Sequence, residues 1–101
     1  MIKLMVIYQM PDDVDKFKQH YVNVHIPLFK KIPNILRTRY SFNPVTLGGD
    51  GEYFCILEAE FADEERLKRA LESEQARIAS EDVPNYSPKP PTIITMSMIE
   101  V

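Results

Sequence analysis

Four segments of the chain are rich in apolar, β-branched and aromatic residues, and turn-forming residues bound them, which predicts four β-strands. The segments span residues 2–10, 35–42, 52–61 and 92–101. Two stretches between them carry apolar residues three or four positions apart, a spacing typical of amphipathic helices. The chain is therefore predicted to fold with its elements in the order βαββαβ.

The first helical stretch has one apolar stripe, formed by Val14, Phe17, Tyr21, Val24 and Leu28. Asp12 and Asp13 precede this stretch and offer an N-cap. Pro27 has no N–H, and its ring disfavours helical angles at Ile26. We therefore expect the helix to end or kink around His25.

The second helical stretch begins at Asp63, and Ser73 offers a second N-cap for a continuation to about Glu81. All three glycines lie within residues 48–51, which predicts a hairpin loop between the second and third strands. Four of the eight prolines lie within residues 83–91, which predicts an irregular surface loop before the last strand.

An α+β, ferredoxin-like domain follows from this order, because helical crossovers after the first and third strands produce one four-stranded antiparallel sheet. We expect residues 1–101 to form a single domain with both helices on one face of the sheet. The strands are apolar on both faces, so the helix-free face would remain an exposed apolar patch. A second copy of the same sheet is the simplest cover, which predicts a homodimer through that face.

Composition excludes several classes of partner. The net charge of −3 and the absence of clustered lysine and arginine argue against nucleic acid and anionic membranes. A single cysteine, Cys55, cannot form an internal disulfide and fits a reducing compartment, so we expect a cytoplasmic protein. We interpret the apolar N-terminus as a strand and not as a signal peptide. No phosphate-binding or metal-binding motif occurs in the sequence, so no cofactor is expected.

The two histidines, His20 and His25, both flank the apolar stripe of the first helix. At about 100° per residue they lie about 140° apart in a regular helix, which makes them poor partners for one metal ion. We expect His20 to lie on the solvent shoulder of the helix. The break at Pro27 would place His25 beside a free carbonyl, where it either packs or serves as an acid or base.

Tyrosine and arginine side chains near the predicted sheet are further candidates, because they orient phenols and carboxylates. The residues expected to contact a substrate in this way are Tyr8, Tyr21, Arg39 and Tyr40. Packing in the core, or a surface position for Arg39, explains them equally well. Glu58 and Glu60 are interpreted as salt-bridge partners at the dimer edge. Asx turns explain Asp82 and Asn85.

Two blocks of the sequence resemble the EthD family signature. The first block contains Phe17, His20-Tyr21, His25, Pro27-Leu28 and Pro33. The second contains Phe61-Ala62-Asp63, Ala70, Ser73-Glu74 and residues 82–86, and the chain ends with the common Glu100-Val101. The proline-rich segment after Tyr86 departs from the usual pattern, in which glycines are frequent. The resemblance implies a dimeric α/β barrel with a small-molecule pocket between helices and sheet, and adds Tyr86 to the expected substrate contacts.

The resemblance also implies an enzyme, either of the type labelled oxidoreductase in this family or a cofactor-independent cyclase, dehydratase or isomerase. We expect it to act on a small hydrophobic or aromatic compound with His25 as acid or base. Two alternatives remain open: a non-catalytic ligand-binding or dimerisation module, and a haem-binding or haem-degrading monooxygenase with His25 as axial ligand. RNA-recognition domains share the element order, but Glu58 and Glu60 would repel phosphate.

Overall fold

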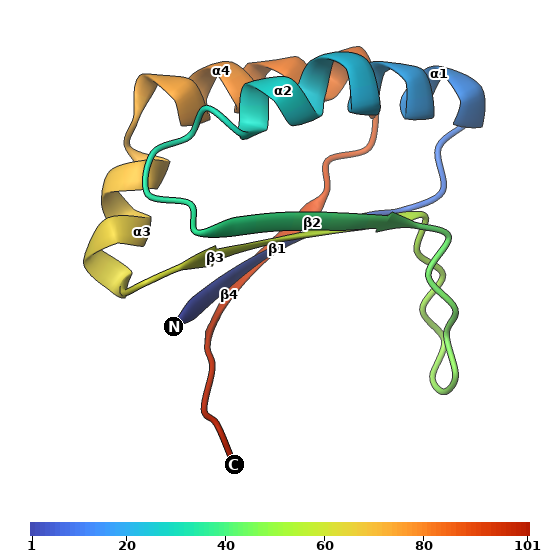
Figure 1. The fold of residues 1–101 in the computed structure, drawn as a ribbon. Coiled ribbons are helices and arrows are strands. Elements are labelled where there is room, and N and C mark those ends of the chain that lie inside the picture. The colour runs from blue at the N-terminus through green and yellow to red at the C-terminus, as the bar shows by residue number, and fades with distance from the viewer.

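The computed structural model describes residues 1–101 as a four-stranded sheet with helices on one face (Figure 1). The strands are β1 (Ile2–Tyr8), β2 (Arg37–Phe42), β3 (Cys55–Phe61) and β4 (Thr92–Ser97). The helices are α1 (Val14–His20), the π-helix η1 (Tyr21–His25), α2 (Ile26–Phe29), α3 (Glu64–Leu71), α4 (Glu74–Asp82) and the 3-10 helix η2 (Val83–Asn85).

The sheet has the strand order β2-β3-β1-β4, and every neighbouring pair is antiparallel. This arrangement confirms the predicted α+β, ferredoxin-like fold. Residues alternate between buried and half-buried along β1 and β3, so every second side chain of these central strands faces the helices. The helix-facing residues of β1 are Ile2, Leu4, Val6 and Tyr8.

The first helical stretch starts as predicted, because the carboxylate of Asp13 accepts a hydrogen bond from the Lys16 N–H at 3.0 Å. The helix does not end around His25, although a π turn interrupts its regular α-helical geometry at this point. Ile26 keeps helical angles, and its N–H donates to the carbonyl of Tyr21, five residues back. The helix thus widens by one π turn before Pro27 and continues into α2.

The second half of the chain follows the predicted caps. The side chain of Asp63 accepts a hydrogen bond from the Arg66 N–H at the start of α3, and Ser73 does the same for Ala76 at the start of α4. Helix α4 crosses over the sheet beside η1 and α2 and ends at Asp82 (Figure 1). The last strand is shorter than predicted, because β4 ends at Ser97 and the tail extends away from the sheet (Figure 1).

Aromatic rings fill the space between α1, η1 and the sheet. The ring of Phe17 is the centre of this cluster, and five other rings have centroids 4.9 to 6.4 Å from it. These rings belong to Tyr8, Tyr21, Phe42, Phe54 and Tyr86. Edge-to-face pairs of this kind contribute about 0.5 to 1.5 kcal/mol each beyond burial. The cluster therefore fixes the position of η1 over β1.

The opposite face of the sheet carries no helix (Figure 1). Its apolar residues are Met5, Ile7, Ile56, Ile94 and Met96, as the strand registers show. Beside them, on β2 and β3, Arg37 pairs with Glu60 and Arg39 pairs with Glu58. None of the helices has the length and apolar character needed to span a membrane.

Candidate functional site

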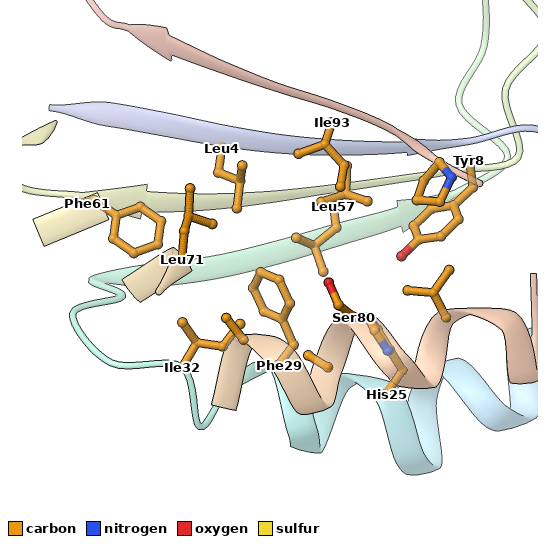
Figure 2. A pocket seen from close by; sticks show the side chains of 15 residues that line it. Leu4, Tyr8, His25, Phe29, Ile32, Leu57, Phe61, Leu71, Ser80 and Ile93 are labelled. Carbon is orange, nitrogen blue, oxygen red and sulfur yellow. The ribbon is translucent and has the colours of Figure 1, made fainter. Parts of the chain in front are cut away.

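A cavity of about 90 Å³ lies between the sheet and the helices (Figure 2). Figure 2 shows Tyr8, His25 and Ser80 toward one end of it, whereas the other end is apolar. The apolar lining residues are Leu4, Val6, Phe29, Ile32, Leu57, Phe61, Leu71, Ala76, Ala79, Val83, Pro91 and Ile93. The lining contains no lysine, arginine, aspartate or glutamate, and His25 is its one residue with an ionisable imidazole. Three lining residues are exposed, Leu71 at the end of α3, Ser80 on α4 and Ile93 on β4, and the cavity opens on the side of α4 and β4.

His25 brings the one titratable imidazole to this cavity. Its side chain is 4% exposed, and its Nδ1 lies 3.1 Å from Oδ2 of Asp82. A carboxylate only accepts hydrogen bonds, so Nδ1 carries the proton and Nε2 of the neutral ring is the free acceptor. Nε2 has no hydrogen-bond partner within the protein, and it is not among the fully enclosed polar atoms. It is therefore not fully enclosed, and the ring to which it belongs lines the cavity.

Asp82 is the centre of a buried hydrogen-bond network. Its Oδ2 accepts from His25, and its Oδ1 accepts from His20 Nε2 at 2.7 Å and from Asn85 Nδ2 at 3.0 Å. Burial alone would raise the pKa of this carboxyl, but the hydrogen bonds from Asn85, His20 and His25 outweigh that effect and hold the pKa below its usual value. Asp82 thus remains a carboxylate at neutral pH.

The ionisation of His25 is set by two opposing effects. Burial disfavours the imidazolium and lowers the pKa of His25, and this effect exceeds the increase caused by the hydrogen bond and charge of Asp82. His25 is therefore neutral at pH 7 and ready to accept a proton. Asp82 then stabilises the imidazolium that forms.

The π turn explains why both histidines reach the same carboxylate. In a regular α-helix, residues five apart diverge around the axis, whereas a π turn contains one additional residue and brings them to the same side. The prediction that His20 faces solvent is therefore wrong: its side chain is 25% exposed, is bonded to Asp82 and stacks on Tyr86. The orienting partner of His25 is likewise a carboxylate and not a free helix carbonyl.

Three of the predicted tyrosines surround this network. The hydroxyls of Tyr8 and Tyr86 are 2.7 Å apart, and the Tyr86 ring lies 4.8 Å from that of His25. Tyr21 stacks on His25, and its enclosed hydroxyl has no hydrogen-bond partner. Burial raises the pKa of Tyr8 to about 12 and also raises that of Tyr21 and Tyr86. All three hydroxyls are therefore protonated at neutral pH, and Tyr8 alone lines the cavity.

The remaining candidates lie farther from the cavity. Arg39 is about half exposed on the helix-free face, where it pairs with Glu58. Tyr40 points to the helix side, packs against the ring of Tyr21 and is 38% exposed. Neither residue lines the cavity. No group of three or more histidine, cysteine, aspartate or glutamate side chains is arranged to hold a metal ion.

The network also contains a residue that sequence reasoning passed over. The sequence pattern predicts Asp82 as a turn residue, whereas the structure buries it at the end of α4, where it joins two histidines that are 57 and 62 residues away in sequence. Its position within the second family-like block was the available signal.

Comparison with known families places these residues in context. Residues 11–89 match the model of the EthD domain. The chain belongs to the EthD family. The matched EthD segment contains His20, His25 and Asp82, as well as all of the cavity-lining residues contributed by the helices.

Two similar proteins have nearly the same length as this chain. An uncharacterised 11.0 kDa protein from the thcB-thcC intergenic region of Rhodococcus erythropolis is 24% identical over 87 residues, which are 86% of this chain and 84% of the relative. The crystal structure of an ethyl tert-butyl ether degradation (EthD) family protein from Bacillus halodurans is 25% identical, with a TM-score of 0.88 over 98% of this chain and 99% of that one.

More distant structures share the fold of this EthD chain. A dimeric ferredoxin-like protein of unknown function from Thermobifida fusca is 14% identical, with a TM-score of 0.71 over 96% of this chain and 90% of that one. SnoaB from Streptomyces nogalater, a cofactor-independent oxygenase, is 11% identical, with a TM-score of 0.67 over 99% of this chain and 94% of that one.

Proposed function

We propose that this EthD protein is an enzyme that binds a small, uncharged hydrophobic or aromatic compound in the cavity and uses His25 to transfer a proton. One observation carries the proposal: a buried imidazole lines a largely apolar cavity, its Nδ1 is bonded to a buried carboxylate, and its Nε2 has no partner within the protein. A general base requires this combination of orientation and neutral ionisation state.

The reaction that fits best is proton transfer without a cofactor, as in an isomerisation, a cyclisation or a dehydration. In the isomerisation case, Nε2 of His25 accepts a proton from a carbon or oxygen of the compound, and the electron pair remains on the compound. The imidazolium, held by Asp82 through Nδ1, then returns the proton to a different atom. The neutral histidine is regenerated, and the product has the same composition as the substrate.

The lining favours an uncharged substrate. No lysine or arginine reaches the cavity, so a carboxylate or phosphate would enter without a counter-charge. The volume of about 90 Å³ is smaller than the ~150 Å³ of an enclosed apolar cavity that holds benzene. A bound compound would therefore place one end inside and extend through the mouth between α4 and β4.

Two hydroxyl groups lie at the polar end of the cavity, on Tyr8 and Ser80 (Figure 2). The Tyr8 hydroxyl keeps its proton at neutral pH and shares a hydrogen bond with Tyr86. A carbonyl or phenol oxygen of the substrate would bind to these hydroxyls, because each is able to donate a hydrogen bond. The charge that develops on that oxygen during proton removal would be stabilised in this way.

The haem alternative does not fit this geometry. A porphyrin would have to reach Nε2 of His25 through a cavity of about 90 Å³, which is walled by the central strands and α4.

SnoaB, a protein with the same fold, is described as a cofactor-independent oxygenase. This description supports the proposal that a protein of this fold can work without a cofactor.

We also propose that two copies associate through the helix-free face of the sheet. The apolar residues of that face support this arrangement, since a patch of this kind costs free energy in water. The Thermobifida fusca protein with the same fold is described as dimeric. A dimer would leave the cavity unobstructed, because the cavity lies on the opposite side of the sheet.

The experiment that tests the function is a structure determination with uncharged aromatic and lactone compounds, combined with turnover assays of the wild type and His25→Gln. We expect a compound in the cavity with an oxygen or an acidic C–H beside Nε2, and loss of turnover in the variant. Binding in the cavity with no turnover in either protein would favour a non-catalytic ligand-binding module. Binding elsewhere would make His25 a packing residue.

A further inference from the structure

The carboxylate of Asp82 is held by donors from both sides. His20 occupies Oδ1 at 2.7 Å, the shorter of the two histidine contacts, and Asn85 donates to the same oxygen. Oδ2 is thereby left to Nδ1 of His25. The carboxylate is 7% exposed, so solvent contributes little to its orientation.

We propose that His20 is a positioning residue that acts through Asp82: it holds the carboxylate so that His25 stays in the tautomer with Nδ1 protonated and Nε2 free toward the cavity. This inference rests on the role proposed for His25. His20 itself is not among the residues that line the cavity.

Loss of the bond from His20 would release this arrangement. Oδ1 would retain only the bond from Asn85, and the carboxylate could rotate away from Nδ1 of His25. A histidine without a fixed acceptor populates both tautomers, and one of them has a proton on Nε2 and cannot act as a base there. The stacking of His20 on Tyr86, which also contacts the His25 ring, adds a second constraint on the same geometry.

His20 also couples the cavity to the surface by charge. Its ring is partly exposed beside a surface hollow that is lined by Asp13, Asp15 and Lys16. On its other side the His20 ring faces Asp82 of α4 and Asn85 of η2. It also stacks on Tyr86, whose hydroxyl is hydrogen-bonded to that of Tyr8. A positive charge on the His20 ring would lie beside the same carboxylate to which His25 is bonded. That charge lowers the pKa of His25, in addition to the larger effect of burial.

The test needs no substrate, because the chain contains only two histidines and both are observable by NMR. The ¹⁵N shifts of the His25 ring and its titration curve would be recorded in the wild type, His20→Gln, His20→Phe and the exposed neighbour control Gln19→Ala. The glutamine amide is able to donate to Oδ1 but does not ionise, whereas phenylalanine retains only the stacking on Tyr86.

We expect the wild type and Gln19→Ala to show one His25 tautomer, protonated on Nδ1. His20→Gln should keep this tautomer, and its His25 should bind a proton at a higher pH than in the wild type, since the charge of His20 that lowers the pKa of His25 is gone. His20→Phe should show a mixture of tautomers. If His20→Phe does not fold, the ¹⁵N shifts of His20→Ala, which also lacks the donor to Oδ1, decide. A single His25 tautomer, protonated on Nδ1, in a folded variant without this donor would overturn the proposal, whatever the outcome for turnover.

Discussion

Asp82 accepts three hydrogen bonds on one buried carboxylate, and the donors come from two distant parts of the chain. A buried charge of this kind is stable only while its donors are present, and the donors depend on it in turn. At the scale of single residues, Asp82 is thus both a structural and a functional position.

We predict that Asp82→Asn lowers the free energy of unfolding by about 1 to 3 kcal/mol. The substituted amide has nearly the same shape, but its NH₂ group would face N–H donors of the histidines. Glu81→Gln, on the preceding and exposed position of α4, serves as the control and should change stability by less than about 0.5 kcal/mol. Urea unfolding measures both. Equal effects would show that the network contributes nothing particular to stability.

The lowered pKa of His25 predicts how stability depends on pH. The unfolded chain binds a proton near the ordinary histidine value of 6.5, whereas the folded chain resists it. Stability contributed by the neutral ring is therefore present above pH 6.5 and is lost as the pH falls below it. Urea unfolding between pH 7.5 and 5.5 should show this loss, and His25→Phe should reduce the slope. A free energy of unfolding that increases as the pH falls over this range would contradict the assignment.

Cap residues and strand patterns made most of the fold predictable from the sequence. Asp63 and Ser73 cap α3 and α4 as expected, and the two-faced apolar pattern located the strands. The contact between His20 and Asp82 was not predictable in the same way, because it joins residues 62 positions apart. It also depends on a π turn, for which regular helical spacing gives the wrong side of the helix.

At the scale of elements, the π turn contains one residue more than a regular turn. Asn23 is exposed within it, so deletion of Asn23 should restore a regular α-helix with the histidines four positions apart and still on one side. Deletion of the exposed Gln75 in α4 is the matched control, because it rotates the buried residues beyond it away from the core.

We expect the Asn23 deletion to retain the His25 tautomer and to cost clearly less stability than the Gln75 deletion. Thermal unfolding and ¹⁵N NMR of the two proteins provide the comparison. A greater loss from the Asn23 deletion would mean that the wide turn has a structural role of its own.

Helix α4 forms one wall of the cavity, and Ala76 lies on its inner side. Ala76→Phe should fill part of the cavity and weaken binding of an uncharged aromatic probe, 2-naphthol, at least about tenfold. Gln75→Phe adds the same side chain on the exposed side of α4 and should leave binding unchanged. Calorimetric titration of both variants measures the effect. Undiminished binding by Ala76→Phe would place the probe site outside the cavity.

At the scale of the whole molecule, the sheet separates two surfaces with different proposed roles. The helices cover one face of the sheet (Figure 1). The cavity lies between the helices and that face, and the other face carries the apolar residues of β1, β3 and β4. Association through the second surface would therefore stabilise the protein without blocking the first.

We expect sedimentation at micromolar concentration to give twice the chain mass of 11.7 kDa. Ile56→Lys, on the helix-free face of the inner strand β3, should shift the protein to monomer, because a buried unpaired charge is costly. Thr95→Lys, exposed on the opposite face of β4, is the control and should remain dimeric. A monomeric wild type would exclude the proposed interface.

The proposed role of His25 is tested most directly by deuterium incorporation. Uncharged enolisable ketones such as phenylacetone and 2-tetralone would be incubated with the protein in D₂O, and loss of the α-proton signal would be followed by NMR. Removal of the proton by Nε2 and return of a deuteron exchanges the label whatever the net reaction is. We expect saturable exchange by the wild type and only background exchange by His25→Gln. Exchange at the same rate in both proteins, or none above background with any ketone of the panel, would contradict the assignment of His25 as the base.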